Sequence, residues 1–125
     1  MKLYAHSTDG PEAEWEALED HLEAVGARAA DLAGKFGAAE YALAAGLLHD
    51  LGKAKPEWQR YLRGLRTAKT PHAAEGARAA TERYSRLHRP WRAPIGRLLA
   101  FAIAGHHAGL ANGIAAGGGL TPLDE

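Results

Sequence analysis

The sequence predicts an all-α fold, a bundle of about five to six helices. Its 125 residues are rich in alanine, leucine, glutamate and arginine, and β-branched residues are scarce. This composition favours helix. Apolar residues also recur every three to four positions in several segments, which is the period of an amphipathic helix. A chain of this length can bury a core without disulfides, and it contains no cysteine to form them.

The first predicted helix begins near Asp9, as N-cap, and Pro11, and ends at Gly37. His21 lies at the edge of its apolar stripe and not on the solvent face. The stripe follows spacings of three and four residues through Trp15, Leu18, Leu22, Val25, Ala29, Leu32 and Phe36.

A second helix is predicted from Ala38 to about Leu51, with His49 and Asp50 in its last turn. Gly52 suits the left-handed position just past a helix end. Two ligand-type side chains therefore stand where an apolar helix stops.

Three further helices are predicted. Pro56 suits the first turn of a short helix ending near Gly64, and Pro71 opens a helix that contains His72. The last runs from Ile95 to about His107, and its predicted inward side carries Ile95, Leu98, Leu99, Ala102, Ile103 and His106. We expect a domain over residues 1–110. Residues 111–125 form a Gly-rich C-terminal segment, which fits the start of a further part of the domain.

Charge is unevenly distributed, although the net charge is zero. Residues 1–50 hold 10 acidic and 3 basic side chains, and residues 51–97 hold 12 basic and 3 acidic ones. The basic stretch is either a set of solvated helix faces or a surface for a polyanion such as DNA. The absence of an export signal or a membrane-length apolar run predicts a cytoplasmic protein that enters no membrane.

Five histidines fall on or beside four apolar helix faces. A single histidine in such a place is more often a satisfied core residue than a ligand. Several neutral imidazoles buried together would each need a hydrogen-bond partner, however, which is a costly arrangement. Bundle interiors are common places for metal sites, so we expect convergence on Asp50 of His21, His49, His72, His106 and His107.

Imidazoles with one carboxylate suit divalent manganese, iron, cobalt, nickel or zinc, and suit magnesium less well. More than four ligands are too many for one tetrahedral ion, so two ions are reasonable. Asp50 is then the natural bridge, because each of its oxygens can reach one ion.

The motifs resemble a known family. LLHDLGKA at 47–54 is similar to the signature of the HD superfamily of metal-dependent phosphohydrolases. Together with AHS at 5–7, EGA at 75–77 and GHHAGL at 105–110, it resembles the HD nuclease domain of the CRISPR-associated nuclease-helicase of type I systems.

That resemblance implies an HD-domain bundle with a metal site in its core, and a hydrolase that cuts mainly single-stranded DNA, as an endonuclease or exonuclease, in antiviral defence. Its implied partners are a superfamily 2 helicase, in the same or a separate chain, and a crRNA-guided surveillance complex. It places one ion on His21, His49 and Asp50, and the other on Asp50, His72, His106 and His107. The implied catalytic residues are Asp50 and Lys53. Lys53 would contact the scissile phosphate or assist the leaving group. For Lys53 the alternative is a charge favouring a helix C-terminus.

The sequence departs from the family in two places. Pro71 and Ala73 flank His72 where an aspartate and a serine are usual in the family. The family also supplies a further aspartate from a helix well after the paired histidines, and this sequence has no good counterpart for it. Two alternatives therefore stay open: an HD phosphohydrolase acting on nucleotides, and a degenerate, non-catalytic HD module. His6, in the AHS motif, is not predicted as a ligand, and His88 is predicted to lie on the surface.

Overall fold

The computed structural model describes residues 1–85 and 92–107. This part of the chain is mostly helical and confirms the all-α prediction, with one small hairpin added. Its elements are β1 (Tyr4–His6), η1 (Glu12–Glu14), β2 (Glu16–Ala17), α1 (Leu18–Gly34), α2 (Ala39–Leu48), η2 (Leu51–Ala54), α3 (Pro56–Leu62), α4 (Ala73–Ser85) and α5 (Ala93–Gly105). The η elements are short 3₁₀ helices. None of the described helices is long and apolar enough to cross a membrane.

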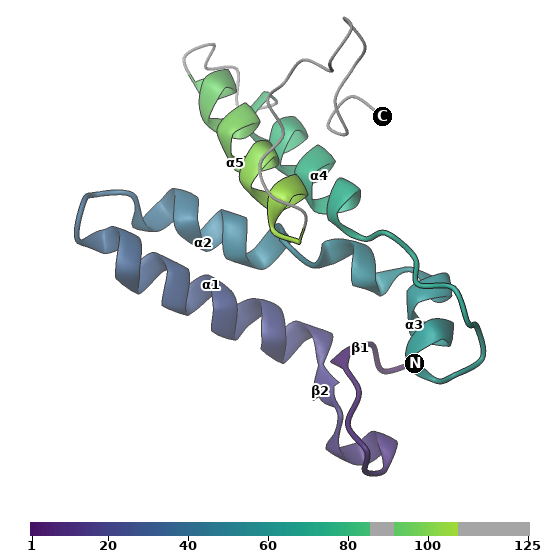
Figure 1. The fold of residues 1–125 in the computed structure, drawn as a ribbon. Coiled ribbons are helices and arrows are strands. Elements are labelled where there is room, and N and C mark those ends of the chain that lie inside the picture. The colour runs from purple at the N-terminus through teal and green to yellow at the C-terminus, as the bar shows by residue number, and fades with distance from the viewer. Residues whose placement is uncertain (86–91, 108–125) are drawn as a thin grey trace, which may run out of the picture.

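Four of the described α-helices form two packed pairs (Figure 1). Helix α1 lies against α2, α4 lies against α5, and α2 also contacts α4 and α5. The main core lies between α2, α4 and α5, and its buried members are Ala44, Ala77, Ala80, Tyr84, Leu99, Ala100 and Ile103. Small side chains dominate this list, so the helix backbones approach closely.

Glycine permits the closest crossings. A methyl group added at Gly46 of α2 would lie 2.5 Å from the Cα of Gly26 in α1. One added at Gly76 of α4 would collide with the carbonyl oxygen of Leu48. These two glycines therefore set the separation of α2 from its neighbours on both sides.

We expect Gly46→Ala to destabilise the protein by about 1–3 kcal/mol, because the added methyl group meets backbone atoms that cannot rotate away. Chemical denaturation monitored by circular dichroism measures this free energy of unfolding. Gly34→Ala is the matched control, because its added methyl group meets only the Cβ of Ala39, at 3.9 Å. Equal stability of the two variants would contradict the proposed crossing.

The predicted start of the first helix is wrong. Residues that were expected to begin it instead form the hairpin, in which Tyr4 pairs with Ala17 and His6 with Glu16. Trp15 precedes the helix and donates its indole N–H to the carbonyl of Gly10 at 3.2 Å. Pro11 flanks η1 and not α1. The hairpin matters because it brings His6 and Glu16 beside His21.

Two apolar faces are also less buried than predicted. The side chains of Leu32 and Phe36 are exposed, Phe36 by 76%, because the described contacts of α1 are with α2 and the hairpin. In α5, Leu98 is 67% exposed and Ala102 is exposed, while Leu99, Ala100 and Ile103 face the core.

The glycine predictions have mixed outcomes. Gly37 and Gly64 have positive φ angles of 78° and 71°, which fits their predicted places at helix ends. The prediction for Gly52 is wrong, because this glycine lies within η2 and not in the left-handed position after a helix end. A Cβ at Gly52 would collide with the carbonyl oxygen of His72, so this glycine permits close approach between η2 and the start of α4. The segment 111–125 and His88 lie outside the described residues.

Candidate metal centre

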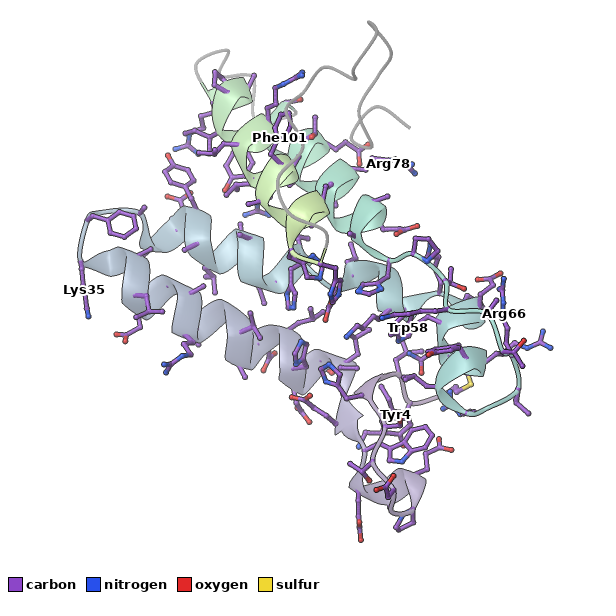
Figure 2. The ribbon with its side chains drawn as sticks, in the orientation of Figure 1. Tyr4, Lys35, Trp58, Arg66, Arg78 and Phe101 are labelled. Atoms are coloured by element: carbon purple, nitrogen blue, oxygen red, sulfur yellow. The ribbon has the colours of Figure 1, made fainter. Side chains whose placement is uncertain are left out.

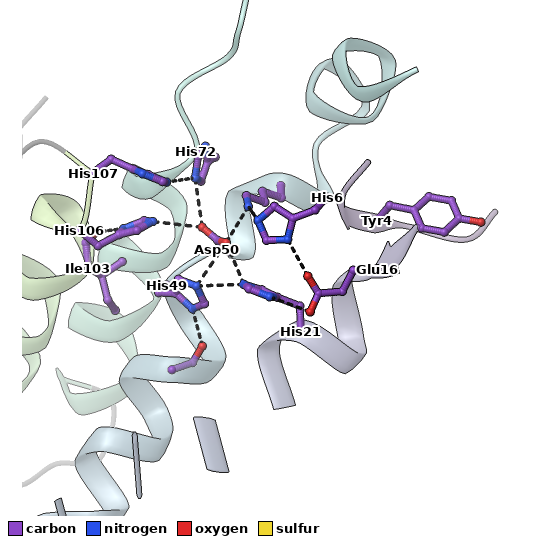
Figure 3. Close-up of polar contacts among 12 residues, drawn as sticks. Tyr4, His6, Glu16, His21, His49, Asp50, His72, Ile103, His106 and His107 are labelled. Carbon is purple, nitrogen blue, oxygen red and sulfur yellow. Dashed lines mark hydrogen bonds and ion pairs between the residues drawn. The ribbon is translucent and has the colours of Figure 1, made fainter. Parts of the chain in front are cut away.

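The candidate centre forms where several helix ends meet (Figure 3). His49 and Asp50 lie at the junction of α2 and η2, and His21 projects from the first turns of α1. His72 directly precedes α4. His106 and His107 directly follow α5. The structure thus brings together all six residues that the sequence singled out.

One oxygen of Asp50 faces two histidines. Its Oδ2 lies 3.2 Å from Nε2 of His21 and 3.2 Å from Nε2 of His49. The two imidazole nitrogens lie 3.3 Å from one another. We call these residues the first set.

The other oxygen of Asp50 faces the remaining histidines. Its Oδ1 lies 3.1 Å from Nε2 of His72 and 3.1 Å from Nε2 of His106. Nε2 of His107 lies 2.9 Å from Nε2 of His72. With Asp50 these three histidines form the second set, and in each set the possible ligand atoms lie within 4.8 Å of one another.

Backbone carbonyls determine which ring nitrogens face Asp50. Nδ1 of His49 donates to the carbonyl of Gly46 at 2.7 Å, and Nδ1 of His106 donates to that of Ile103 at 2.6 Å. Each neutral ring therefore aims the lone pair of its Nε2 at a carboxylate oxygen. Two facing lone pairs repel unless a proton or a metal cation lies between them. The donor set thus fits a cation.

The spacing within the first set also fits a metal ion. A tetrahedral site with metal–ligand bonds of about 2.0 Å has edges of about 3.3 Å. The three separations in the first set, between 3.2 and 3.3 Å, match one face of such a tetrahedron. Its nitrogen and oxygen donors suit a divalent transition metal.

The electrostatics of the centre favour positive charge. Burial opposes ionisation of Asp50, but hydrogen bonds from His49 and His72, when a proton is on their Nε2 atoms, and from Lys53 outweigh it and hold the pKa of Asp50 well below its usual range. The hydrogen bond to Asp50 raises the pKa of His49. Burial and the neighbouring His106 and His72 lower the pKa of His107. Asp50 is therefore a carboxylate at neutral pH.

Lys53 belongs to the centre and is not an exposed charge at a helix end. Its side chain is buried, and its Nζ lies 2.8 Å from Oδ2 of Asp50 and 3.2 Å from Nε2 of His6. The ammonium also lies 5.4 Å from the centre of the Trp58 ring. A cation so placed offsets the buried carboxylate.

Gln59 is a buried residue that the sequence did not reveal. Its Oε1 accepts from the backbone N–H of Tyr4 at 3.1 Å, and its Nε2 donates to the carbonyls of Tyr4 and Lys53, both at 2.8 Å. It thereby ties α3 to β1 and η2. A glutamine one position from a tryptophan gave no signal, because its partners lie on β1 and η2.

His72 is held in place by packing and by contacts of its backbone neighbours. Its ring packs edge-on against Trp58, with 4.5 Å between ring centres. Lys55 donates to the carbonyl of Pro71 at 3.0 Å and pairs with Glu75. These contacts fix the backbone next to His72 although Pro71 and Ala73 offer no polar side chain. Trp58 is itself buried, so its ring is not available to stack on nucleic-acid bases.

These features define a helical domain with a two-sided cluster of histidines around one aspartate. The HD domain family matches residues 18–118, a range that contains all six cluster residues. The chain belongs to the HD domain family, whose members are typically metal-dependent phosphohydrolases. No curated protein matches the chain significantly.

Proposed function

We propose that this domain is a metal-dependent DNA nuclease that hydrolyses phosphodiesters, mainly in single-stranded DNA. One observation carries the proposal: the two oxygens of a single buried aspartate face two separate histidine sets. Two-metal centres bridged in this way are suited to hydrolysis of phosphate esters. Membership in the HD family supports the same class of chemistry.

The roles of the residues follow from their positions. His21 and His49 would hold one ion, and His72, His106 and His107 the other, with Asp50 shared between them. Bound divalent metals supply an activated water and stabilise the charge that develops on the phosphate. Lys53 holds a positive charge beside Oδ2 of Asp50, from where it can attract a phosphate oxygen.

A polynucleotide substrate is supported by the exposed cations near the centre. Lys69 is exposed, and its Nζ lies 5.7 Å from the centre of the Trp58 ring, which packs against His72. The structure also leaves several arginines exposed on α3, α4 and the segment between them, namely Arg60, Arg66, Arg78 and Arg83. Figure 2 shows Arg66 and Arg78 on the side of the molecule away from Lys35. A strand held by Lys69 would lie near Trp58 and therefore near His72 of the second set.

The motifs shared with type I nuclease-helicases extend the proposal to the biological setting. We propose that the domain works in the cytoplasm in CRISPR antiviral defence, beside a superfamily 2 helicase and a crRNA-guided surveillance complex. The support for this setting is the order of AHS, HDLGK and GHH along the sequence.

Digestion of a single-stranded DNA circle with manganese or nickel tests the function. The unsubstituted protein is expected to cut the circle, and the double variant His49→Ala, Asp50→Ala is expected to lose the activity. Cutting of mononucleotides but not of the circle would favour a nucleotide phosphohydrolase. Absence of both metal and hydrolysis would favour a non-catalytic module.

Lys69→Ala is expected to weaken binding of single-stranded DNA about two- to fivefold, which is the effect of one exposed ion pair. The slope of log affinity against log salt concentration should become shallower by about 0.7, because one phosphate contact is lost. Fluorescence anisotropy with a labelled oligonucleotide at several salt concentrations measures both quantities.

Lys35→Ala is the control for Lys69→Ala, because Lys35 is also exposed but lies at the far end of the α1–α2 pair (Figure 2). Its salt dependence should equal that of the unsubstituted protein. Identical behaviour of the two variants would contradict the proposed path of the strand.

A further inference from the structure

The hairpin places a second polar group beside the metal centre. His6 and Glu16 face each other across β1 and β2, and both side chains are about half exposed. Neither residue belongs to the two histidine sets, and the proposed chemistry does not use them. Their hydrogen bonds nevertheless lead directly to the first set.

Glu16 contacts two imidazoles at once. Its Oε2 lies 2.6 Å from Nδ1 of His6, and its Oε1 lies 3.2 Å from Nδ1 of His21. A carboxylate only accepts hydrogen bonds, so both rings carry a proton on Nδ1. In the neutral rings the lone pairs are then on Nε2, on the side away from Glu16.

Both Nε2 atoms have a partner in the centre. That of His21 faces Oδ2 of Asp50 at 3.2 Å, and that of His6 lies 3.2 Å from Nζ of Lys53. Lys53 in turn contacts Oδ2 of Asp50 at 2.8 Å. The contacts form a closed ring that starts and ends at Asp50 (Figure 3).

We propose that Glu16 is a positioning residue of the metal centre: it directs Nε2 of His21 toward the first ion and, through His6, fixes the ammonium of Lys53 beside Asp50. This inference rests on the proposed function. Carboxylates that hold a ligand histidine through its second ring nitrogen commonly strengthen metal binding. Here one carboxylate holds a ligand histidine and a second histidine that contacts Lys53.

The same three side chains have a competing use. Ligand atoms of His6, Glu16 and His21 lie within 4.8 Å of one another and could themselves hold a cation. His21 would then have to bind through Nδ1, which cannot carry a proton at the same time. Since His21 in the first set uses Nε2 and keeps its proton on Nδ1, the positioning role is the one compatible with a loaded first set.

Glu16→Gln tests the proposal, because an amide has one acceptor oxygen and can satisfy only one of the two Nδ1–H groups. Manganese affinity is measured by calorimetry in two backgrounds, His106→Ala to isolate the first set and His21→Ala to isolate the second. We expect Glu16→Gln to weaken binding about 10–100-fold in the first background and to leave it unchanged in the second. Glu16→Asp should restore part of the affinity.

Glu19→Gln is the matched control, because it changes the charge in the same way as Glu16→Gln. Glu19 lies in the first turn of α1 and is exposed. An unchanged affinity in the His106→Ala background, or equal weakening in both backgrounds, would overturn the positioning role. The positioning role would also be overturned if the unsubstituted protein bound a third ion and Glu16→Gln removed that ion. Absence of any metal binding in the unsubstituted protein would instead contradict the proposed function itself.

Discussion

Asp50→Asn is expected to abolish binding of both metal ions and to lower DNA cutting by at least about 10³-fold. The reason is that one side chain supplies an oxygen to each set, and a neutral amide is a much weaker ligand than a carboxylate. Two metals contribute several kcal/mol to stabilising the transition state, and each 1.4 kcal/mol changes the rate tenfold. Single-turnover cutting of a labelled strand measures the effect.

Thermal unfolding provides an independent measurement for Asp50→Asn. A ligand present at 100 times its dissociation constant stabilises the folded protein by about 2.7 kcal/mol, so manganese should raise the melting temperature of the unsubstituted protein. The variant should show no rise. Asp31→Asn is the control, because Asp31 is exposed on α1, and it should respond to metal normally. A normal metal response in Asp50→Asn would show that the aspartate is not the shared ligand.

His21→Ala and His106→Ala are each expected to remove one ion and leave the other. The two rings contact different oxygens of Asp50, so each variant disables one set. Loss of a ligand should weaken the affected ion by more than about 100-fold, since loss of an outer partner alone costs 10–100-fold. Native mass spectrometry should show a change from two ions per chain to one.

The pair of variants also tests whether cutting needs both ions. If both ions act on the same phosphate, each variant should lose most of the activity while retaining one metal. His6→Ala is the comparison, because His6 is outside both sets and should retain two ions. Loss of both ions in either variant, or of neither, would contradict the division of the centre at Asp50.

His49, Asp50, His72, His106 and His107 could be singled out from the sequence because each stands near a predicted helix end with its own local signal, and His21 because it lies at the edge of an apolar stripe. The apolar run before His49, Pro71 before His72 and the apolar helix before His106 mark three such ends. What periodicity could not provide is the contact between those ends. That contact depends on close packing at Gly52 and Gly76, which were not predicted to have this role.

The errors in the predicted fold have a common cause. Trp15 falls in phase with the apolar stripe of α1, but it lies between η1 and β2, and its ring packs edge-on against Tyr4 of β1. In α5, alanines on both sides of the helix look equally apolar, so the sequence alone does not show whether Leu98 or Ala100 faces the core. The close packing of Gly96 against Tyr84 determines which side of α5 faces the core. Long-range contacts override local pattern at both places.

The central claim is that Asp50 is shared between two metal positions, and a crystal soaked in manganese tests it most directly. Anomalous difference maps should show two peaks, one beside Oδ2 with His21 and His49, and one beside Oδ1 with His72, His106 and His107. Absence of any peak next to Asp50, or a peak held by His6 and Glu16 alone, would contradict the account.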